Sequence, residues 1–156
     1  MSESSPHRIV ADADVLAADL LVGGPAREAL DHVRSHTWLT LVASEHLLSE
    51  AQAVVADLAG PELAADWRER IDAATERVDH PEGDHPALAS AYRGGAAHLL
   101  TFDQSLRSSK TGLSIQPHAD LSIRPPDAFA RLFDPASLYP VVVGGEYPGP
   151  DADPRG

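Results

Sequence analysis

Apolar positions along the chain follow two different patterns. Short continuous apolar runs at residues 8–13, 38–43 and 98–102 predict strands that are buried on both faces. Between them, apolar residues recur every three or four positions, which predicts helices over 15–22, 26–35, 45–58, 62–77, 86–93 and 126–133. The segments 113–116 and 121–123 compete for a last edge strand. Because strand and helix patterns alternate, we expect an α/β domain with three layers, in which helices cover both faces of a mainly parallel central sheet.

The patterned part of the chain corresponds to one domain. A length of 156 residues fits a single domain with a real core. We expect residues 1–7 to be a flexible N-terminus, 8–139 to form the domain, and 140–156, which are rich in Pro, Gly and Asp, to be a disordered tail. No apolar run is long enough to span a bilayer, and residues 1–7 lack the features of a signal peptide. We therefore expect a cytoplasmic protein without a membrane partner.

Charge is strongly asymmetric in this sequence. Twenty-four acidic residues face twelve basic ones, giving a net charge of −12, and Lys110 is the only lysine. Acids dispersed over most predicted helices indicate adaptation to high salt; the alternative is an ordinary acidic protein from a GC-rich genome. Because the screening length falls to roughly 3 Å at 1 M salt, the net charge does not exclude a nucleic-acid substrate.

The composition also limits the metal chemistry that is open to this chain. It contains no cysteine, which excludes disulfides and zinc–thiolate sites. Its eight histidines show no spacing typical of a zinc site, and we expect His80 and His85 to lie at the surface.

Four acids fall at strand ends or in the first turns of predicted helices. Asp12 ends the first strand, with Asp14 beside it, and Glu50 follows six residues after Ser44, which is a good helix cap. Asp84 precedes the helix that begins at Pro86, and Asp103 ends the strand at 98–102. Ligands bind at the carboxyl ends of parallel strands, and carboxylate oxygens suit Mg²⁺ or Mn²⁺. Converging there, the four acids would form a divalent-metal site.

Each of these acids also has a purely structural interpretation. Asp12 would serve as a capping or turn residue, and Asp84 and Asp103 as caps of the helices that follow them. Glu50 would be a solvated helix residue. Arg107 and Lys110, close after Asp103, are candidates for contacts with substrate phosphates, although such residues are more often simply solvated.

The acidic motifs together resemble the PIN-domain (VapC-like) ribonucleases. The motifs that carry the resemblance are Asp12-Ala13-Asp14-Val15-Leu16, Leu47-Leu48-Ser49-Glu50, Asp84 with Ala89 and Ala91, and Thr101-Phe102-Asp103. Their order and spacing cover residues 8–133. The sequence departs from the family pattern at two positions, with Asp14 where Asn is common and Phe102 where a small residue is frequent.

This resemblance implies a metal-dependent endoribonuclease that hydrolyses phosphodiesters. Asp12, Glu50, Asp84 and Asp103 would hold one or two Mg²⁺ or Mn²⁺ ions, and Asp14 would lie beside them without ligating. The family further implies an RNA substrate and a role as the toxin of a toxin–antitoxin pair or in RNA processing. An antitoxin protein and a second copy in a homodimer are the expected partners.

Three other functions compete with this interpretation. A catalytically degenerate PIN-like module would bind RNA or a protein partner without cleaving. Haloacid-dehalogenase-like phosphatases carry an Asp-x-Asp motif that Asp12 and Asp14 match, but the chain lacks the paired acids of their later motifs. Response-regulator receivers need an acceptor aspartate at the end of the third strand, whereas Asp57 lies within a predicted helix.

Overall fold

Parallel strands form the centre of the molecule in the computed structural model, which describes residues 5–81, 83, 85–106 and 121–154. The strands of these segments are β1 (Ser5–Ala11), β2 (Thr40–Ser44), β3 (Thr75–Val78), β4 (Ala96–Leu100) and β5 (Ser122–Arg124). They form one sheet in the order β3-β2-β1-β4-β5, and every pairing is parallel. The expected mainly parallel sheet is therefore confirmed, with β1 at its centre.

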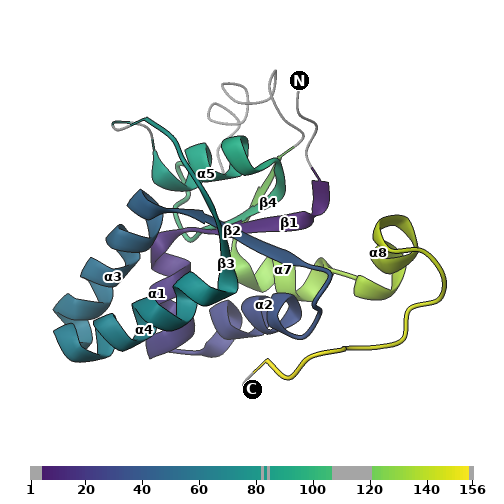
Figure 1. The fold of residues 1–156 in the computed structure, drawn as a ribbon, viewed down its shortest axis with the longest axis horizontal. Coiled ribbons are helices and arrows are strands. Elements are labelled where there is room, and N and C mark those ends of the chain that lie inside the picture. Colours follow the sequence, from purple (N-terminus) through teal and green to yellow (C-terminus); the bar gives the residue numbers. More distant parts are fainter. Residues whose placement is uncertain (1–4, 82, 84, 107–120, 155–156) are drawn as a thin grey trace.

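Helices cover both faces of this sheet, as the three-layer prediction requires (Figure 1). The helix α5 (Pro86–Gly94) lies on one face. The opposite face carries α1 (Ala13–Leu21), α2 (Gly24–Arg34), α3 (Glu45–Ala59), α4 (Pro61–Ala74) and α7 (Pro126–Leu132). The last helix, α8 (Pro135–Val142), lies at one end of the molecule beside the start of the C-terminal segment. No described helix is both long and apolar enough to cross a membrane.

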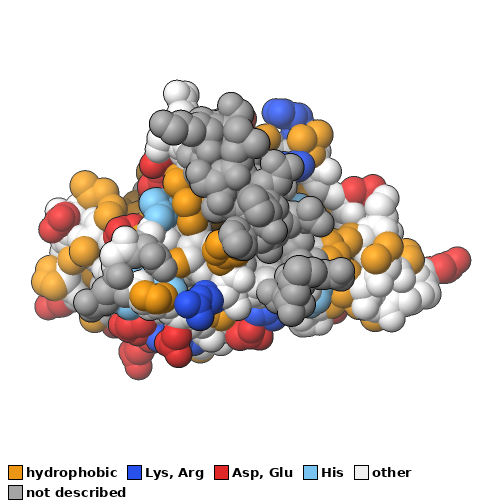
Figure 2. Space-filling model, turned by 90° about the horizontal axis from the view of Figure 1, so that it is seen from above, with side chains coloured by type: hydrophobic (Ala, Val, Ile, Leu, Met, Phe, Trp, Pro, Cys, Tyr) orange, Lys and Arg blue, Asp and Glu red, His pale blue; other side chains and the backbone are white. Residues whose placement is uncertain are grey.

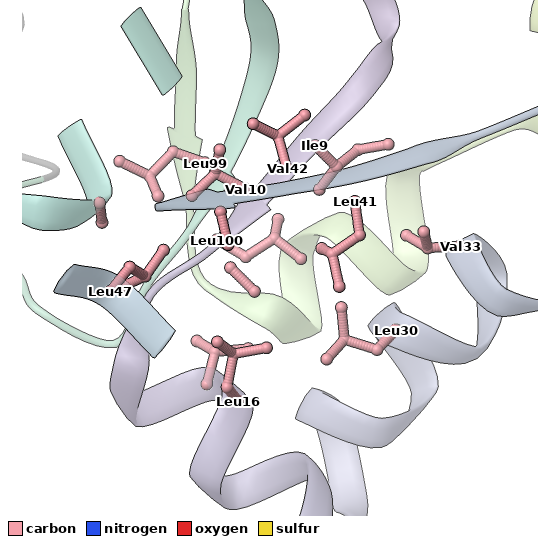
Figure 3. Close-up of a cluster of buried hydrophobic side chains, with 14 of the residues drawn as sticks. Ile9, Val10, Leu16, Leu30, Val33, Leu41, Val42, Leu47, Leu99 and Leu100 are labelled. Carbon is pink, nitrogen blue, oxygen red and sulfur yellow. The ribbon is translucent and has the colours of Figure 1, made fainter. Parts of the chain in front are cut away.

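The core lies between the sheet and its helices. Ile9, Val10 and Ala11 of β1 are all fully buried, as expected for a central strand covered on both faces. Figure 3 shows Leu41 pointing towards the helices of one face, where Leu30 lies, whereas its neighbour Val42 points to the other face. This alternation follows from the two-residue period of a strand.

On the α5 face, helix and sheet approach each other closely at Gly94. A Cβ atom at this position would lie 2.5 Å from Cγ1 of Val42. Only glycine therefore allows the end of α5 to pack directly on β2.

Two predicted boundaries differ in the structure. The helix predicted over 62–77 ends at Ala74, and Thr75–Val78 forms the edge strand β3. The predicted flexible N-terminus contributes to β1 from Ser5 onwards, where the Ser5 amide bonds the carbonyl of Gly95. Of the two candidate edge strands, the one near 121–123 forms β5, whereas 113–116 lies outside the described residues.

The C-terminal segment, expected to be a disordered tail, is anchored to the body in the structure. The Asp151 carboxylate accepts hydrogen bonds from the Thr37 amide and hydroxyl at 2.7 and 2.6 Å. The Tyr147 hydroxyl lies 2.6 Å from Nε2 of His36, and the amide of Asp151 bonds the Ser35 carbonyl. The tail thus has specific polar partners that its composition does not reveal.

Candidate functional site

The strand order creates a switch point at the carboxyl ends of β1 and β4. From β1 the chain builds the sheet outwards through β2 and β3, and then returns to the other side of β1 with β4 and β5. Ligands of open α/β sheets bind where the order reverses in this way. Asp12 follows β1 directly, and Thr101 to Asp103 follow β4. The topology therefore brings two of the four predicted acids to the same edge.

Asp12 is a buried carboxylate with two local partners. Only 6% of the residue is exposed. Its Oδ1 accepts the amide of Ala13 at 2.8 Å, and its Oδ2 accepts the hydroxyl of Thr101 at 2.7 Å. Because Asp12 also caps α1, its capping role and its place at the switch point coincide.

Thr101 connects the two strand ends. Its hydroxyl donates to Asp12 and accepts the amide of Asp103 at 3.0 Å. Its own amide bonds the carbonyl of Arg124 at the end of β5. Thr101 is fully buried, so it fixes the positions of both aspartates, a role that the sequence motif alone does not assign.

Asp14, in the first turn of α1, carries an unsatisfied oxygen. Its Oδ1 is buried and has no hydrogen-bond partner. Burial, with the negative charges of Asp12 and Asp103 as further causes, raises the pKa of Asp14 from 3.8 to about 6, although the amides of Val15 and Phe102 partly offset this rise. An unpaired carboxylate oxygen facing like charges is unfavourable unless a proton or cation compensates it.

Asp103 lies at the exposed side of the same edge. Its Oδ1 accepts the Ser105 hydroxyl at 2.7 Å and the Ser105 amide at 2.9 Å. These hydrogen bonds are the main reason that the pKa of Asp103 is lowered, and the charge of His85 contributes. Asp103 therefore stays ionised at neutral pH and presents negative charge to solvent.

Of the remaining predicted site residues, Glu50 alone lies in the part of the chain that the structure describes. Glu50 lies in the second turn of α3, and its side chain is exposed. Asp84, Arg107 and Lys110 lie outside the described residues. Within the segments that the structure describes, no three acidic or histidine side chains are arranged to hold a metal ion.

Asp12, Asp14 and Asp103 are not arranged as a metal site in the described structure, but their carboxylate oxygens are the type of ligand that a hard divalent cation takes. Ionised carboxylates only accept, and the orphaned Asp14 oxygen is the kind of ligand that Mg²⁺ or Mn²⁺ takes. A bound cation would also relieve the repulsion among Asp12, Asp14 and Asp103. Asp14, which the sequence places beside the metal, thus becomes a candidate ligand in its own right.

A second polar cluster lies at the carboxyl ends of β2 and β3. His80 is only 8% exposed, so the expectation that it lies at the surface is wrong, whereas His85 is exposed as expected. Nε2 of His80 lies 2.8 Å from Oγ of Ser44, and its Nδ1 lies 2.9 Å from the carbonyl of Pro81. Ser44 also caps α3 by accepting the Leu47 amide. This cluster ties the loop after β3 to the start of α3.

Comparison with known proteins places the chain in a family but leaves its activity open. No curated protein and no solved structure matches it. The profile of a family of unknown function, DUF7384, matches residues 3–155, which is nearly the whole chain. The protein therefore belongs to the DUF7384 family.

Proposed function

We propose that this protein is a metal-dependent phosphodiester hydrolase that acts on RNA. The observation that carries the proposal is the group of three carboxylates at the switch point, one of them with a buried, unpaired oxygen. Such an arrangement is unfavourable for folding, which is typical of a site that is kept for function. The motif resemblance to the PIN-domain ribonucleases supports RNA as the substrate.

Each residue has a distinct role in this proposal. Asp12 is held rigid by its bonds to Ala13 and Thr101 and provides a fixed negative charge. Asp14 and Asp103 add charge from the helix side and the solvent side. A bound Mg²⁺ or Mn²⁺ would lower the pKa of a water molecule and neutralise charge on the phosphate. Without a cation, the same carboxylates would repel the substrate.

The resemblance to the PIN-domain ribonucleases also supports two biological roles, toxin or RNA-processing enzyme. A toxin of a toxin–antitoxin pair would arrest growth on expression and would be neutralised by a small partner protein encoded beside it. An RNA-processing enzyme would show neither property. Under either role, a homodimer is a further part of the proposal.

Incubation of the purified protein with a panel of single-stranded RNAs tests the proposal. The reactions contain Mn²⁺, Mg²⁺ or EDTA, in dilute buffer and in multi-molar KCl. We expect cleavage that needs the cation and is lost in Asp12→Asn and Asp103→Asn. Asp134→Asn is the matched control, because Asp134 caps α8 as Asp12 caps α1 but lies away from the switch point.

A non-cleaving RNA- or protein-binding module is the second candidate function. It is favoured by the exposed position of Glu50 and by the lack of a three-residue metal group among the described residues. A folded protein that neither cleaves RNA nor takes up Mn²⁺ in calorimetry at either salt concentration would refute the hydrolase and support this module.

A further inference from the structure

An exposed aromatic ring lies within the proposed site. Phe102 is 42% exposed and stands between Thr101 and Asp103. The other large hydrophobic side chains that are strongly exposed in the described part of the chain lie elsewhere. Val22 and Leu58 lie at the distal ends of α1 and α3, and Leu132, Val141 and Val143 belong to the region of α7 and α8. Figure 2 shows apolar side chains gathered at that α8 end, whereas acidic side chains are dispersed along the margins.

The backbone that carries Phe102 is held on both sides. The amide of Thr101 bonds the carbonyl of Arg124, and the amide of Asp103 bonds the Thr101 hydroxyl. The amide of Phe102 itself faces the carboxylate of Asp14. The peptide segment that carries the ring is therefore fixed, and little backbone entropy is lost when a ligand packs on the ring.

We propose that Phe102 is a stacking platform for one base of a single-stranded RNA, next to the phosphate at Asp12, Asp14 and Asp103. This inference rests on the proposed function and names the form of its substrate. Aromatic rings that accept bases without regard to sequence are common in proteins that bind single strands. A base inside a duplex is already stacked on both faces, so Phe102 would select unpaired RNA.

The surroundings of Phe102 favour a base over a protein partner. Protein docking sites on a surface are usually contiguous apolar patches of several hundred square ångströms, roughly 300 Å² or more. Phe102 is instead a single exposed ring, next to Asp103 in the sequence and with its amide at the Asp14 carboxylate, so a protein partner would have to cover acidic groups as well. A nucleotide needs only one ring to stack on. A cation bound by the carboxylates of Asp12, Asp14 and Asp103 would also bind the phosphate of that nucleotide.

The test measures the affinity of the full chain for an oligouridine strand with a single 2-aminopurine moved along successive positions. Binding is followed in Ca²⁺, with the RNA checked for integrity on a gel. Phe102→Ala and Phe102→Leu remove the aromatic face, Phe102→Trp retains it, and Leu58→Ala is the control for an exposed apolar side chain. Thermal melting establishes that each variant is folded.

We expect Phe102→Ala and Phe102→Leu to bind the single strand roughly 5- to 150-fold more weakly, the range measured for loss of one stacked base. Phe102→Trp should bind as tightly as the wild type, and binding should change 2-aminopurine fluorescence in the wild type and Phe102→Trp but not in Phe102→Leu. Duplex RNA should bind all variants equally. Wild-type affinity in Phe102→Leu, or an equal loss for duplex, would refute stacking.

The same experiment separates this inference from the proposed function. If the wild type cleaves RNA and Phe102→Ala binds as tightly as the wild type, the stacking role is refuted and the hydrolase stands. If the wild type neither binds nor cleaves RNA, both are refuted.

Discussion

Substitution of Asp14 by asparagine should stabilise the protein. The rise in the pKa of Asp14 from 3.8 to about 6 corresponds to about 3 kcal/mol of unfavourable interaction of the ionised form. Because the side chain is only half buried, solvent screening reduces this to about 1–2 kcal/mol. The neutral amide of Asp14→Asn removes the cost of burying a charge and the repulsion from Asp12 and Asp103. For a chain of this length, the melting temperature should rise by roughly 2–8 °C at pH 7.

The stability that Asp14→Asn gains over the wild type must increase as the pH rises. Between pH 4 and 6 the folded protein keeps a proton on Asp14 that the unfolded chain has released, so wild-type stability falls as pH rises. Above this range both states are ionised and the penalty is constant. Carboxylates with lowered pKa, such as Asp103 and Glu45, act in the opposite sense. The difference between variant and wild type is therefore the informative quantity.

Urea unfolding of both proteins at several pH values from 4 to 8 measures that difference. We expect it to be near zero at pH 4 and to reach its full value at about pH 7. Added Mn²⁺ should then stabilise the wild type more than the variant, because a cation that binds the folded state shifts unfolding by mass action. A difference that is independent of pH, or a variant less stable than the wild type at pH 7, would show that Asp14 is not under electrostatic strain.

Three further changes test other parts of the structure. Thr101→Val leaves Oδ2 of the buried Asp12 and the Asp103 amide without their partner. It should lower the free energy of unfolding in urea by about 1–3 kcal/mol, whereas Thr101→Ser should retain most of the stability. Gly94→Ala should lower the free energy of unfolding by about 1–3 kcal/mol, because its Cβ meets Val42. The double variant Gly94→Ala, Val42→Ala should lose less stability than the sum of the two single variants. Additive losses would contradict the close packing. Asp151→Ala removes the hydrogen bonds that anchor the C-terminal segment to Thr37, so a protease should trim this segment faster than in the wild type. Mass spectrometry measures the trimming. Equal rates for the variant and the wild type would mean that the anchor is weak.

Local patterns in the sequence were sufficient to predict most of the architecture. The run of Ile9, Val10 and Ala11 is apolar throughout because β1 is covered on both faces. Helix starts were also predictable, since Ser44 caps α3 through the Leu47 amide. The same logic placed Asp12 and Asp103 at strand ends, and the parallel sheet then brings these ends to one edge.

The features that the sequence did not reveal depend on contacts between distant segments. Thr75–Val78 continues a helical pattern, and it is pairing with β2 that makes this segment a strand. His80 is buried through its hydrogen bond to Ser44, which is 36 residues away. The strain on Asp14 likewise arises mainly from burial in the folded chain, to which the charges of Asp12 and of Asp103, brought by β4, are added. Such effects have no local signature because they are created by the tertiary structure.

The central position of β1 has a consequence for how the chain folds. One edge of β1 pairs with β2, whereas the other pairs with β4, so that Ile9 lies opposite His98. The segment between Ile9 and His98 must close as a long loop, which costs entropy before the contacts between β1 and β4 form. We therefore expect β1, β2 and β3 to associate first and β4 to dock late. The hydrogen bond between Asp12 and Thr101 crosses that last seam. During synthesis, the growing chain therefore exposes a free apolar strand edge until β4 emerges, which makes this stage the one most prone to aggregation and most dependent on chaperones.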